Sequence, residues 1–317
     1  MTTHELSGYL ASYLAVRTAL GVRLQHEQRL LESFIDSVNR QGVSAPVRAV
    51  MAVDWACTPS PQGPRADAAR RLSVVRRFLT FVRAHAPETE VPDHHLVAGA
   101  RRRAPYVFTP EQLTALLHAA RQASPPESLR PHTLATLVGV LASTGIRTGE
   151  ALQLELSDVQ LDADPPRLLI APAKFHKARW VPLHATTVTQ LRQYLQLRQQ
   201  YVPQSTTKVV FLSATGHPVR HAALLSWFSQ TCRRLGFQPT ENMRRPCLHS
   251  LRHTFAVRRV VEWYDAGLDV HERLPHLSVY LGHIHPRESY WYLTATPELL
   301  RQAASRFARY ARQGGGV

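Results

Sequence analysis

The spacing of apolar residues predicts a bundle of helices in the N-terminal part of the chain. Leu6, Leu10 and Tyr13 recur at helical intervals, and two similar stripes lie within residues 30–38 and 72–82. A proline-rich segment, residues 58–64, separates the second stripe from the third and is typical of a loop. Because stripes of this kind usually form a core, we expect residues 1 to about 85 to fold as a helical bundle.

A linker and the start of a second domain follow the bundle. Prolines and an arginine triplet interrupt the apolar pattern between residues 87 and 105, a composition typical of interdomain linkers. A new helix is predicted after Thr109, which can act as its N-cap, with Pro110 as its first residue and Gln112 completing a capping box. We therefore expect an N-terminal helical domain at residues 1–98, a linker at 99–107 and a second domain at 108–317.

The pattern of the second domain combines longer helical stretches with short extended ones. Helical periodicity is clear at residues 134–143, 187–200, 222–235 and 297–310. Residues 168–171 and 179–183 are typical of the two strands of a hairpin, and residues 209–212 of a short strand or an extended segment. The predicted fold is mainly α with a small β-sheet (α+β): a helical bundle followed by a mixed α/β domain.

Composition and charge indicate a globular protein that binds an anionic polymer. The 317 residues are 44% hydrophobic and 19% charged, a balance typical of folded domains. The formal net charge is +15; residues 1–100 hold 11 Arg against 9 Asp or Glu, a net of +2, which leaves +13 for the rest of the chain. An excess of this size favours nucleic acid as the partner.

Three groups of basic residues are candidates for contacts with double-stranded DNA. The first lies on the helix after the proline-rich loop, the second in the linker and the third in the predicted hairpin. Their members are Arg70, Arg71, Arg76 and Arg77; Arg101, Arg102 and Arg103; and Lys177 and Arg179. The alternatives are a solvated helix face for the first group and a soluble tether for the second.

Cysteine usage and hydropathy point to a cytoplasmic protein with no membrane contact. Cys57, Cys232 and Cys247 form no CxxC pair and no plausible disulfide framework, which fits a reducing compartment. The N-terminus has no signal-peptide pattern, and the longest apolar stretch, residues 134–142, is too short to cross a bilayer.

Side chains suited to binding a phosphate gather near the C-terminus. His249 and Arg252 lie one helical turn apart in an HxxR motif, so both can face a single anion. His283 follows, and then two tyrosines, Tyr290 and Tyr292. Since no acidic or cysteine ligand occurs among them, the set suits phosphate better than a metal ion.

Two upstream segments carry further candidates. Arg147 lies at a loop-to-helix junction among apolar residues, where a charge needs a partner; Glu150, three residues later, is an internal alternative to an external anion. Of the 38 basic residues, three are lysines, and two of these, Lys174 and Lys177, occupy the predicted hairpin. This concentration favours a function that needs an ammonium group able to give up a proton.

Together these motifs resemble those of the tyrosine recombinase (integrase) family. The matching segments are TGIRTGEAL around Arg147, the hairpin with Lys174 that ends in KARWVPL, HSLRHTFA with His249 and Arg252, LGH with His283, and Tyr292. Order, spacing and flanking residues agree over roughly residues 105–310. The N-terminal bundle is similar in size and helicity to the family's core-binding domain.

The resemblance implies a DNA strand transfer that uses no metal ion and no nucleotide cofactor. In this family the tyrosine attacks the scissile phosphate, which leaves a 3'-phosphotyrosyl bond and a free 5'-hydroxyl. Arg147 and Arg252 would clamp the non-bridging oxygens, and Lys174 would protonate the departing 5'-oxygen. His249 would accept or steady the proton of the tyrosine, and His283 would donate to a phosphate oxygen.

Two assignments within the resemblance have a competitor. Lys177 lies near Lys174, which we prefer because Lys177 matches the commoner basic residue of the following strand. Tyr290 lies near Tyr292, which the register after the LGH motif favours. His253 follows Arg252 directly, points elsewhere on the helix and is expected to be structural.

The implied function is site-specific recombination, for integration, excision or resolution of a mobile element, plasmid or chromosome dimer. Such enzymes act as tetramers on two paired duplexes, with a monomer or dimer expected for the free protein. The helix predicted at residues 297–310 is the candidate for donation to a neighbouring subunit. The alternatives are a type IB topoisomerase-like enzyme that relaxes DNA and a non-catalytic DNA-binding protein of the same fold.

Overall fold

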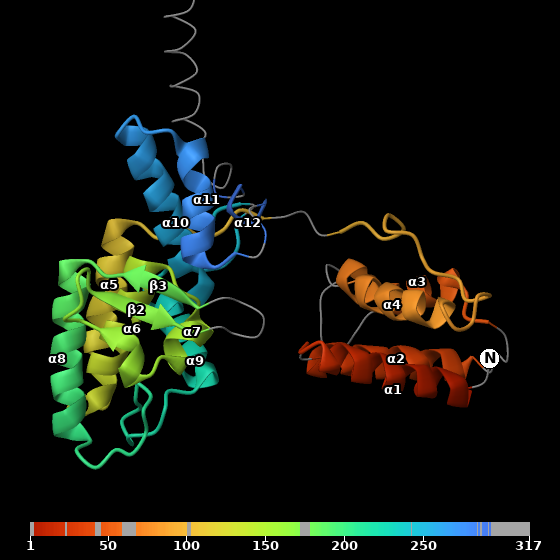
Figure 1. Cartoon of the computed structure of the whole chain (residues 1–317), viewed down its shortest axis with the longest axis horizontal. Coiled ribbons are helices and arrows are strands. Elements are labelled where there is room, and N and C mark those ends of the chain that lie inside the picture. Colours follow the sequence, from red (N-terminus) through yellow and green to blue (C-terminus); the bar gives the residue numbers. More distant parts are fainter. Residues whose placement is uncertain are drawn as a thin grey trace, which may run out of the picture. The chain divides into compact units, whose positions relative to one another are not determined.

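The computed structural model divides the chain into two compact units, residues 1–102 and 103–317 (Figure 1). The structure describes residues 3–22, 24–41, 46–58, 68–99, 103–171, 178–241, 243–283, 285, 287–290 and 292. The division falls inside the predicted linker, residues 99–107. Helices dominate the described residues, and their one sheet has three short strands. The predicted fold class, mainly α with a small sheet, is confirmed.

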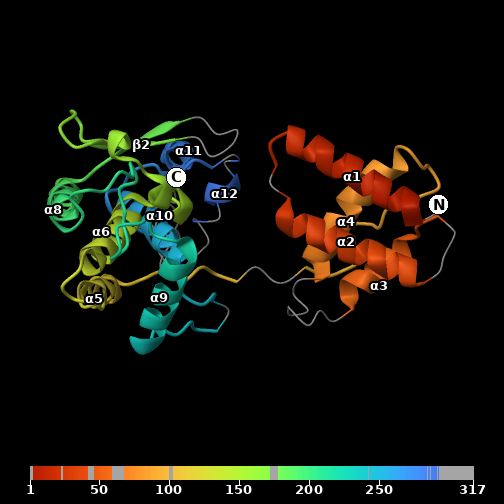
Figure 2. The same ribbon diagram turned by 90° about the horizontal axis from the view of Figure 1, so that it is seen from below.

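The N-terminal unit is built from α1 (Thr3–Ala19), α2 (Gln25–Arg40), α3 (Ala49–Cys57) and α4 (Ala68–Arg83). Helix α4 packs against each of the other three (Figure 2). The apolar stripes predicted from the sequence supply the core, in which Phe34 and Phe78 are fully buried and Phe34 meets Trp55 edge to face. The predicted helical bundle is therefore confirmed for this part of the chain.

Arg71, one of the predicted DNA contacts, has a structural role in this unit. Its side chain is buried and its guanidinium lies 4.2 Å from the centre of the Trp55 ring. It donates hydrogen bonds to the carbonyl oxygens of Trp55, Ala56 and Thr58 at 2.8, 3.3 and 2.8 Å. The last carbonyls of a helix lack partners within the helix, and Arg71 supplies them for α3. Its predicted contact with a DNA phosphate stays a prediction.

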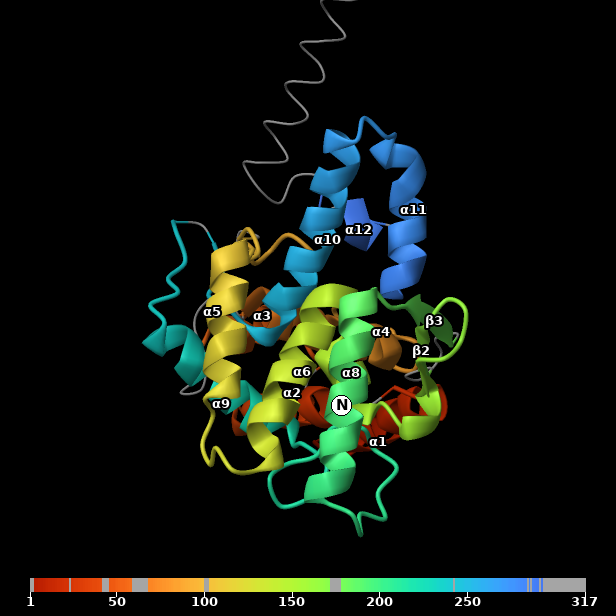
Figure 3. The same cartoon turned by 90° about the vertical axis from the view of Figure 1, so that its left-hand side faces the viewer.

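An apolar helix forms the centre of the second unit. Helix α6 (Leu129–Thr144) packs against α5 (Pro110–Arg121), α8 (Ala185–Tyr201) and α10 (Leu248–Asp265) (Figure 3). Helix α9 (His221–Arg234) packs against α5. The capping box predicted at Thr109 and Gln112 is present at the start of α5. Although α6 is apolar on most sides, no helix among the described residues is long and apolar enough to cross a membrane.

The small sheet carries the predicted hairpin. Strands β1 (Val159–Gln160), β2 (Arg167–Ile170) and β3 (Arg179–Pro182) lie in that order and all pair antiparallel. Leu168 and Val181 face each other across β2 and β3, and both are fully buried. The strands predicted at residues 168–171 and 179–183 are thus confirmed, whereas β1 was not predicted because two residues carry no readable alternation. Residues 209–212 form isolated bridges at their two ends.

The connection between Arg252 and His283 is a pair of helices. Helices α10 and α11 (Val270–Leu281) lie side by side, and the short α12 (Arg287–Tyr290) lies against α11 (Figure 3). Apolar residues of α10 and α11, among them Val260 and Leu274, form a cluster that also includes the ring of Tyr292. The helix predicted at residues 297–310 lies outside the described residues.

Gly145, which ends α6, gives a first test of this packing. Its φ is +65°, and a Cβ added there would lie 2.5 Å from the ring of Phe255 and 3.2 Å from Leu281. We expect Gly145→Ala to lower the free energy of unfolding by about 2–4 kcal/mol, through left-handed backbone strain plus overpacking. Gly139→Ala is the matched control, because Gly139 lies within α6 with open space around it and should gain about 0.5–1 kcal/mol. Denaturant unfolding of both variants measures the difference, and equal stabilities would contradict the expectation.

Candidate active site

Four separate segments bring the predicted phosphate-binding side chains together. Arg147 precedes α7 (Thr148–Gln153), His249 and Arg252 lie at the start of α10, and His283 follows the end of α11. Tyr292 packs on the apolar residues of α10 and α11. Five of the six residues predicted to be catalytic therefore meet in one place. The sixth, Lys174, lies outside the described residues.

Arg147 is anchored on two sides. Its Nη1 donates to Oε1 of Glu150 at 3.0 Å, and its backbone N–H donates to Oε2 of the same carboxylate at 2.8 Å. Its Nη2 donates to the carbonyl oxygen of Gly282 at 2.7 Å. The internal salt bridge considered from the sequence is present, yet 35% of the side chain stays exposed. Because a guanidinium carries five N–H donors, these bonds leave capacity for a phosphate.

Arg252 is buried at the centre of the cluster. Only 2% of it is exposed, and its two terminal nitrogens donate to the carbonyl oxygens of Gly145 at 2.9 Å and Leu281 at 2.7 Å. Burial lowers the pKa of Arg252 to about 10, and the neighbouring Tyr292 opposes this shift. The guanidinium is therefore still charged at neutral pH, as an anion-binding role requires.

Both histidines of the cluster are uncharged at neutral pH. Desolvation by the surrounding protein, followed by repulsion from Arg252 and Arg147, lowers the pKa of His249 to about 4, although its side chain reaches the surface. The same causes in the same order lower the pKa of His283 to about 3. The Nδ1 of His283 lies 2.7 Å from the buried hydroxyl of Ser289. Neutral imidazoles can each accept one proton and donate another.

Tyr292 rather than Tyr290 belongs to this cluster. The Tyr292 ring is 2% exposed and stacks on His283, with ring centres 6.1 Å apart. Tyr290 is 48% exposed. His253, predicted to be structural, also belongs to the site: its ring packs edge to face on Tyr292 at 5.7 Å and on His249 at 4.5 Å.

Sequence reasoning missed Ser289 and the part played by His253. No motif marks Ser289, because its contact with His283 depends on how the chain turns after α11. His253 lies one turn along α10 from His249, and that i, i+4 spacing was a readable signal.

The residues predicted to bind DNA have varied positions. Arg179 is half-buried and is directed at Glu150, to which it donates at 3.1 and 2.7 Å, so it forms an internal ion pair, and its predicted DNA contact stays a prediction. Of the remaining described members, Arg70 and Arg103 are exposed, Arg76 contacts His94, and Arg77 pairs with Glu27 at 2.9 Å. Arg101, Arg102 and Lys177 lie outside the described residues.

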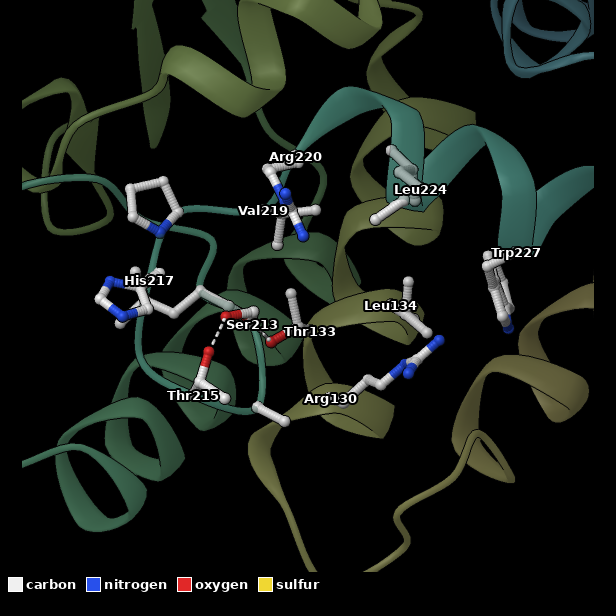
Figure 4. A pocket seen from close by; sticks show the side chains of 14 residues that line it. Arg130, Thr133, Leu134, Ser213, Thr215, His217, Val219, Arg220, Leu224 and Trp227 are labelled. Carbon is white, nitrogen blue, oxygen red and sulfur yellow. Dashed lines mark hydrogen bonds between the residues drawn. The ribbon is translucent and has the colours of Figure 1, made fainter.

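The second unit also contains cavities. A cavity of about 240 Å³ is lined by Arg147, Glu150 and Asp158 and adjoins the cluster. A larger one, of about 470 Å³, has an apolar wall with Leu134 and Trp227 (Figure 4). It lies at the starts of α6 and α9 and is lined by none of the predicted site residues that the structure describes.

The lowered histidine pKa values give a pH prediction for the DNA-free protein. The unfolded chain takes up protons at these histidines near pH 6.5, whereas the folded protein does so near pH 4 and pH 3. Their contribution to stability is therefore present above pH 6.5 and is lost as the pH falls from 6.5 toward 4 for His249 and toward 3 for His283.

Ring-proton NMR titration measures this directly, with His249→Gln and His283→Gln used to assign the two signals. We expect both imidazoles to stay neutral well below the ordinary histidine pKa of 6.5. Thermal unfolding should show a smaller loss of stability on acidification in His283→Gln than in the wild type. A titration midpoint near 6.5 for either ring would contradict the expectation.

Comparison with known proteins assigns the chain to a family. Residues 106–298 match the model of the phage integrase family. The chain is 35% identical to a putative integrase/recombinase, y4rB of Sinorhizobium fredii, over 302 residues that span 94% of this chain and 95% of that protein. It is 27% identical to tyrosine recombinase XerC of Roseiflexus castenholzii, over 67% of this chain and 64% of that one.

A solved structure shows the same fold. A lambda integrase tetramer bound to a Holliday junction matches with a TM-score of 0.65 and 17% identity, over 92% of this chain and 77% of that one. Clustered arginines, neutral histidines and a tyrosine thus occur in a chain whose sequence matches the family model over most of its second unit. The protein belongs to the phage integrase family of tyrosine recombinases.

Proposed function

We propose that this protein is a site-specific DNA recombinase that cleaves and rejoins strands through a 3'-phosphotyrosyl intermediate. The observation that carries the proposal is the meeting of Arg147, Arg252, His249, His283 and Tyr292 at one place in the second unit. Two fixed positive charges suit a phosphodiester, and a phenol beside them suits a nucleophile.

The chemical step follows from the character of each group. The hydroxyl oxygen of Tyr292 attacks phosphorus, a Tyr O–P bond forms and the P–O5' bond breaks. Arg147 and Arg252 bind the non-bridging oxygens and stabilise the charge that develops on them. His249, neutral at the start, takes the phenolic proton, and His283 donates a hydrogen bond to the phosphate. Lys174 gives its proton to the departing 5'-oxygen.

Access to the nucleophile requires movement. The Tyr292 ring is buried against residues of α10 and α11, so a DNA strand reaches its hydroxyl only after the chain around it shifts. Such a step couples DNA binding to assembly of the active site. It also suits a reaction in which subunits on paired sites must act in turn.

The proposal also covers the DNA contacts, the assembly and the location of the protein. We assign the exposed Arg70 and Arg103, with Arg76, Arg77, Arg101, Arg102 and Lys177, to DNA binding, with a tetramer on two duplexes as the active form. The matching lambda integrase is a tetramer on a Holliday junction, which supports this assembly. The free thiols Cys57, Cys232 and Cys247 fit a cytoplasmic location.

The test is covalent capture of DNA. Duplexes made from the DNA that flanks the gene, each nicked next to a candidate site, are mixed with the protein and separated under denaturing conditions. A recombinase gives a protein–DNA adduct at a defined sequence. Relaxation of any supercoiled plasmid without a defined site would favour the topoisomerase alternative. DNA binding with no adduct on any substrate would favour the non-catalytic one.

A further inference from the structure

Three arginines from three different elements bond to three successive carbonyl groups at the end of α11. Arg179 of β3 donates to Tyr280 at 2.8 Å, Arg252 of α10 to Leu281 at 2.7 Å and Arg147 to Gly282 at 2.7 Å. The last carbonyls of a helix lack intrahelical partners and form the negative end of its dipole, so cations are stabilised there. The end of α11 is thus a platform that places three guanidiniums side by side.

Arg179 differs from the other two in where its remaining bonds go. Its two terminal nitrogens donate to the two carboxylate oxygens of Glu150, at 3.1 and 2.7 Å, and its side chain is only 12% exposed. Glu150 in turn holds both the guanidinium and the backbone N–H of Arg147. Burial alone would raise the pKa of Glu150, but the hydrogen bonds from Arg179 and Arg147 lower it overall, so the carboxylate is ionised.

The fit around Arg179 is tight. Gly282 has a φ of +68°, and a Cβ added there would lie 2.8 to 3.2 Å from the guanidinium atoms of Arg179. The guanidinium therefore lies directly against the backbone that leads into His283. One side chain contacts the platform, the carboxylate that orients Arg147 and the turn that carries a histidine of the site.

We propose that Arg179 is a positioning residue for strand cleavage, which rests on the proposed recombinase function. It neutralises Glu150 and holds the end of α11, so that Arg147 and Arg252 keep their charge and direction toward the phosphate. Since β2 and β3 are the paired strands on either side of the chain segment that includes Lys174, Arg179 ties this strand pair to the phosphate-binding arginines.

Removal of Arg179 should therefore slow cleavage without weakening DNA binding. In Arg179→Gln, Glu150 pairs with Arg147 alone and draws that guanidinium from the phosphate, and the carbonyl of Tyr280 loses its donor. We expect the single-turnover rate of adduct formation at saturating DNA to fall about 10–100-fold. DNA affinity and its salt dependence, measured by fluorescence anisotropy, should not change.

The matched control is Arg167→Gln. Arg167 lies on the adjacent strand β2, stacks on Trp180 and bonds to Gln160, and within the described residues it forms no hydrogen bond to Glu150 or to α11. We expect its rate of adduct formation to stay within about twofold of the wild type, because partly exposed surface contacts contribute little.

A double-mutant cycle separates positioning from a general loss of structure. If Arg179 acts through Glu150, the double variant Arg179→Gln with Glu150→Gln should be no slower than the slower single variant, whereas independent effects would multiply. Should Arg179→Gln not fold, Arg179→Lys serves in its place, because a lysine keeps the charge but cannot bond both Glu150 and Tyr280 in this geometry.

Three results would overturn the inference. The first is an unchanged rate of adduct formation in Arg179→Gln or Arg179→Lys, and the second is multiplication of the two single effects in the double variant. The third is a salt slope of DNA binding that falls by about one in the variant, which would mark Arg179 as a phosphate contact. If the wild type forms the adduct and one of these results is found, the role proposed for Arg179 is wrong and the recombinase proposal stands. If the wild type forms no adduct at any flanking sequence, the recombinase proposal itself fails.

Discussion

Replacement of Tyr292 by phenylalanine should abolish the covalent protein–DNA adduct while DNA binding stays intact. The phenyl ring has no hydroxyl oxygen with which to form a bond to phosphorus, so the covalent link at this position cannot form. The ring keeps its volume and its contacts with His253 and His283, so the fold should be preserved. Denaturing gels on a nicked duplex measure the adduct, and a mobility shift on the same duplex measures binding.

Tyr290→Phe is the matched control for this experiment. Tyr290 lies two residues before Tyr292 in the chain but is 48% exposed, against 2% for Tyr292. We expect Tyr290→Phe to form the adduct at the wild-type rate. An adduct that survives Tyr292→Phe and disappears in Tyr290→Phe would show that the other tyrosine is the nucleophile.

Arg147→Gln should lower the rate of adduct formation by about 10²–10³-fold, the effect typical of losing one donor that stabilises transition-state charge. Arg147 is 35% exposed, so its guanidinium is open to an incoming phosphate in a way that the buried Arg252 is not. Glu150 keeps its bonds to Arg179 in this variant, which limits the loss of unfolding free energy to about 1–3 kcal/mol. Single-turnover kinetics and denaturant unfolding measure the two quantities.

Arg259→Gln controls for the loss of one positive charge. Arg259 lies on α10, as Arg252 does, but forms an exposed ion pair with Glu262 at 2.8 Å. Exposed pairs of this kind contribute about 0–1 kcal/mol, and we expect both the rate and the stability to stay close to those of the wild type. Equal losses in Arg147→Gln and Arg259→Gln would mean that net charge, not position, governs cleavage.

Local patterns predicted well wherever the physical cause is local. The capping box at Thr109 depends on atoms three residues apart, and the hairpin on alternation within four residues, so both are readable in the chain and both are present. The apolar stripe of α4 likewise has a period that only a helix can turn to one side.

Two arginines, Arg71 and Arg179, have internal partners that the sequence does not reveal. Arg71 and Arg179 are indistinguishable in sequence from exposed arginines, because no neighbouring residue in the chain indicates which groups they bind. The carbonyls that Arg71 binds come from the end of α3. Arg179 binds the carboxylate of Glu150 and the carbonyl of Tyr280, which lie 29 and 101 residues away in the chain. Only the folded chain shows that these charges are already satisfied.

The order of residue types along this chain was enough to determine its helical bundle, its mixed second domain and five side chains suited to one phosphate. The tertiary structure alone decided how those side chains are held: Arg252 buried on two carbonyls, both histidines neutral and Tyr292 covered. The physical reason is that residue type determines which charges and hydrogen-bond donors a site can have. Their burial and pairing depend on segments that meet only when the chain folds.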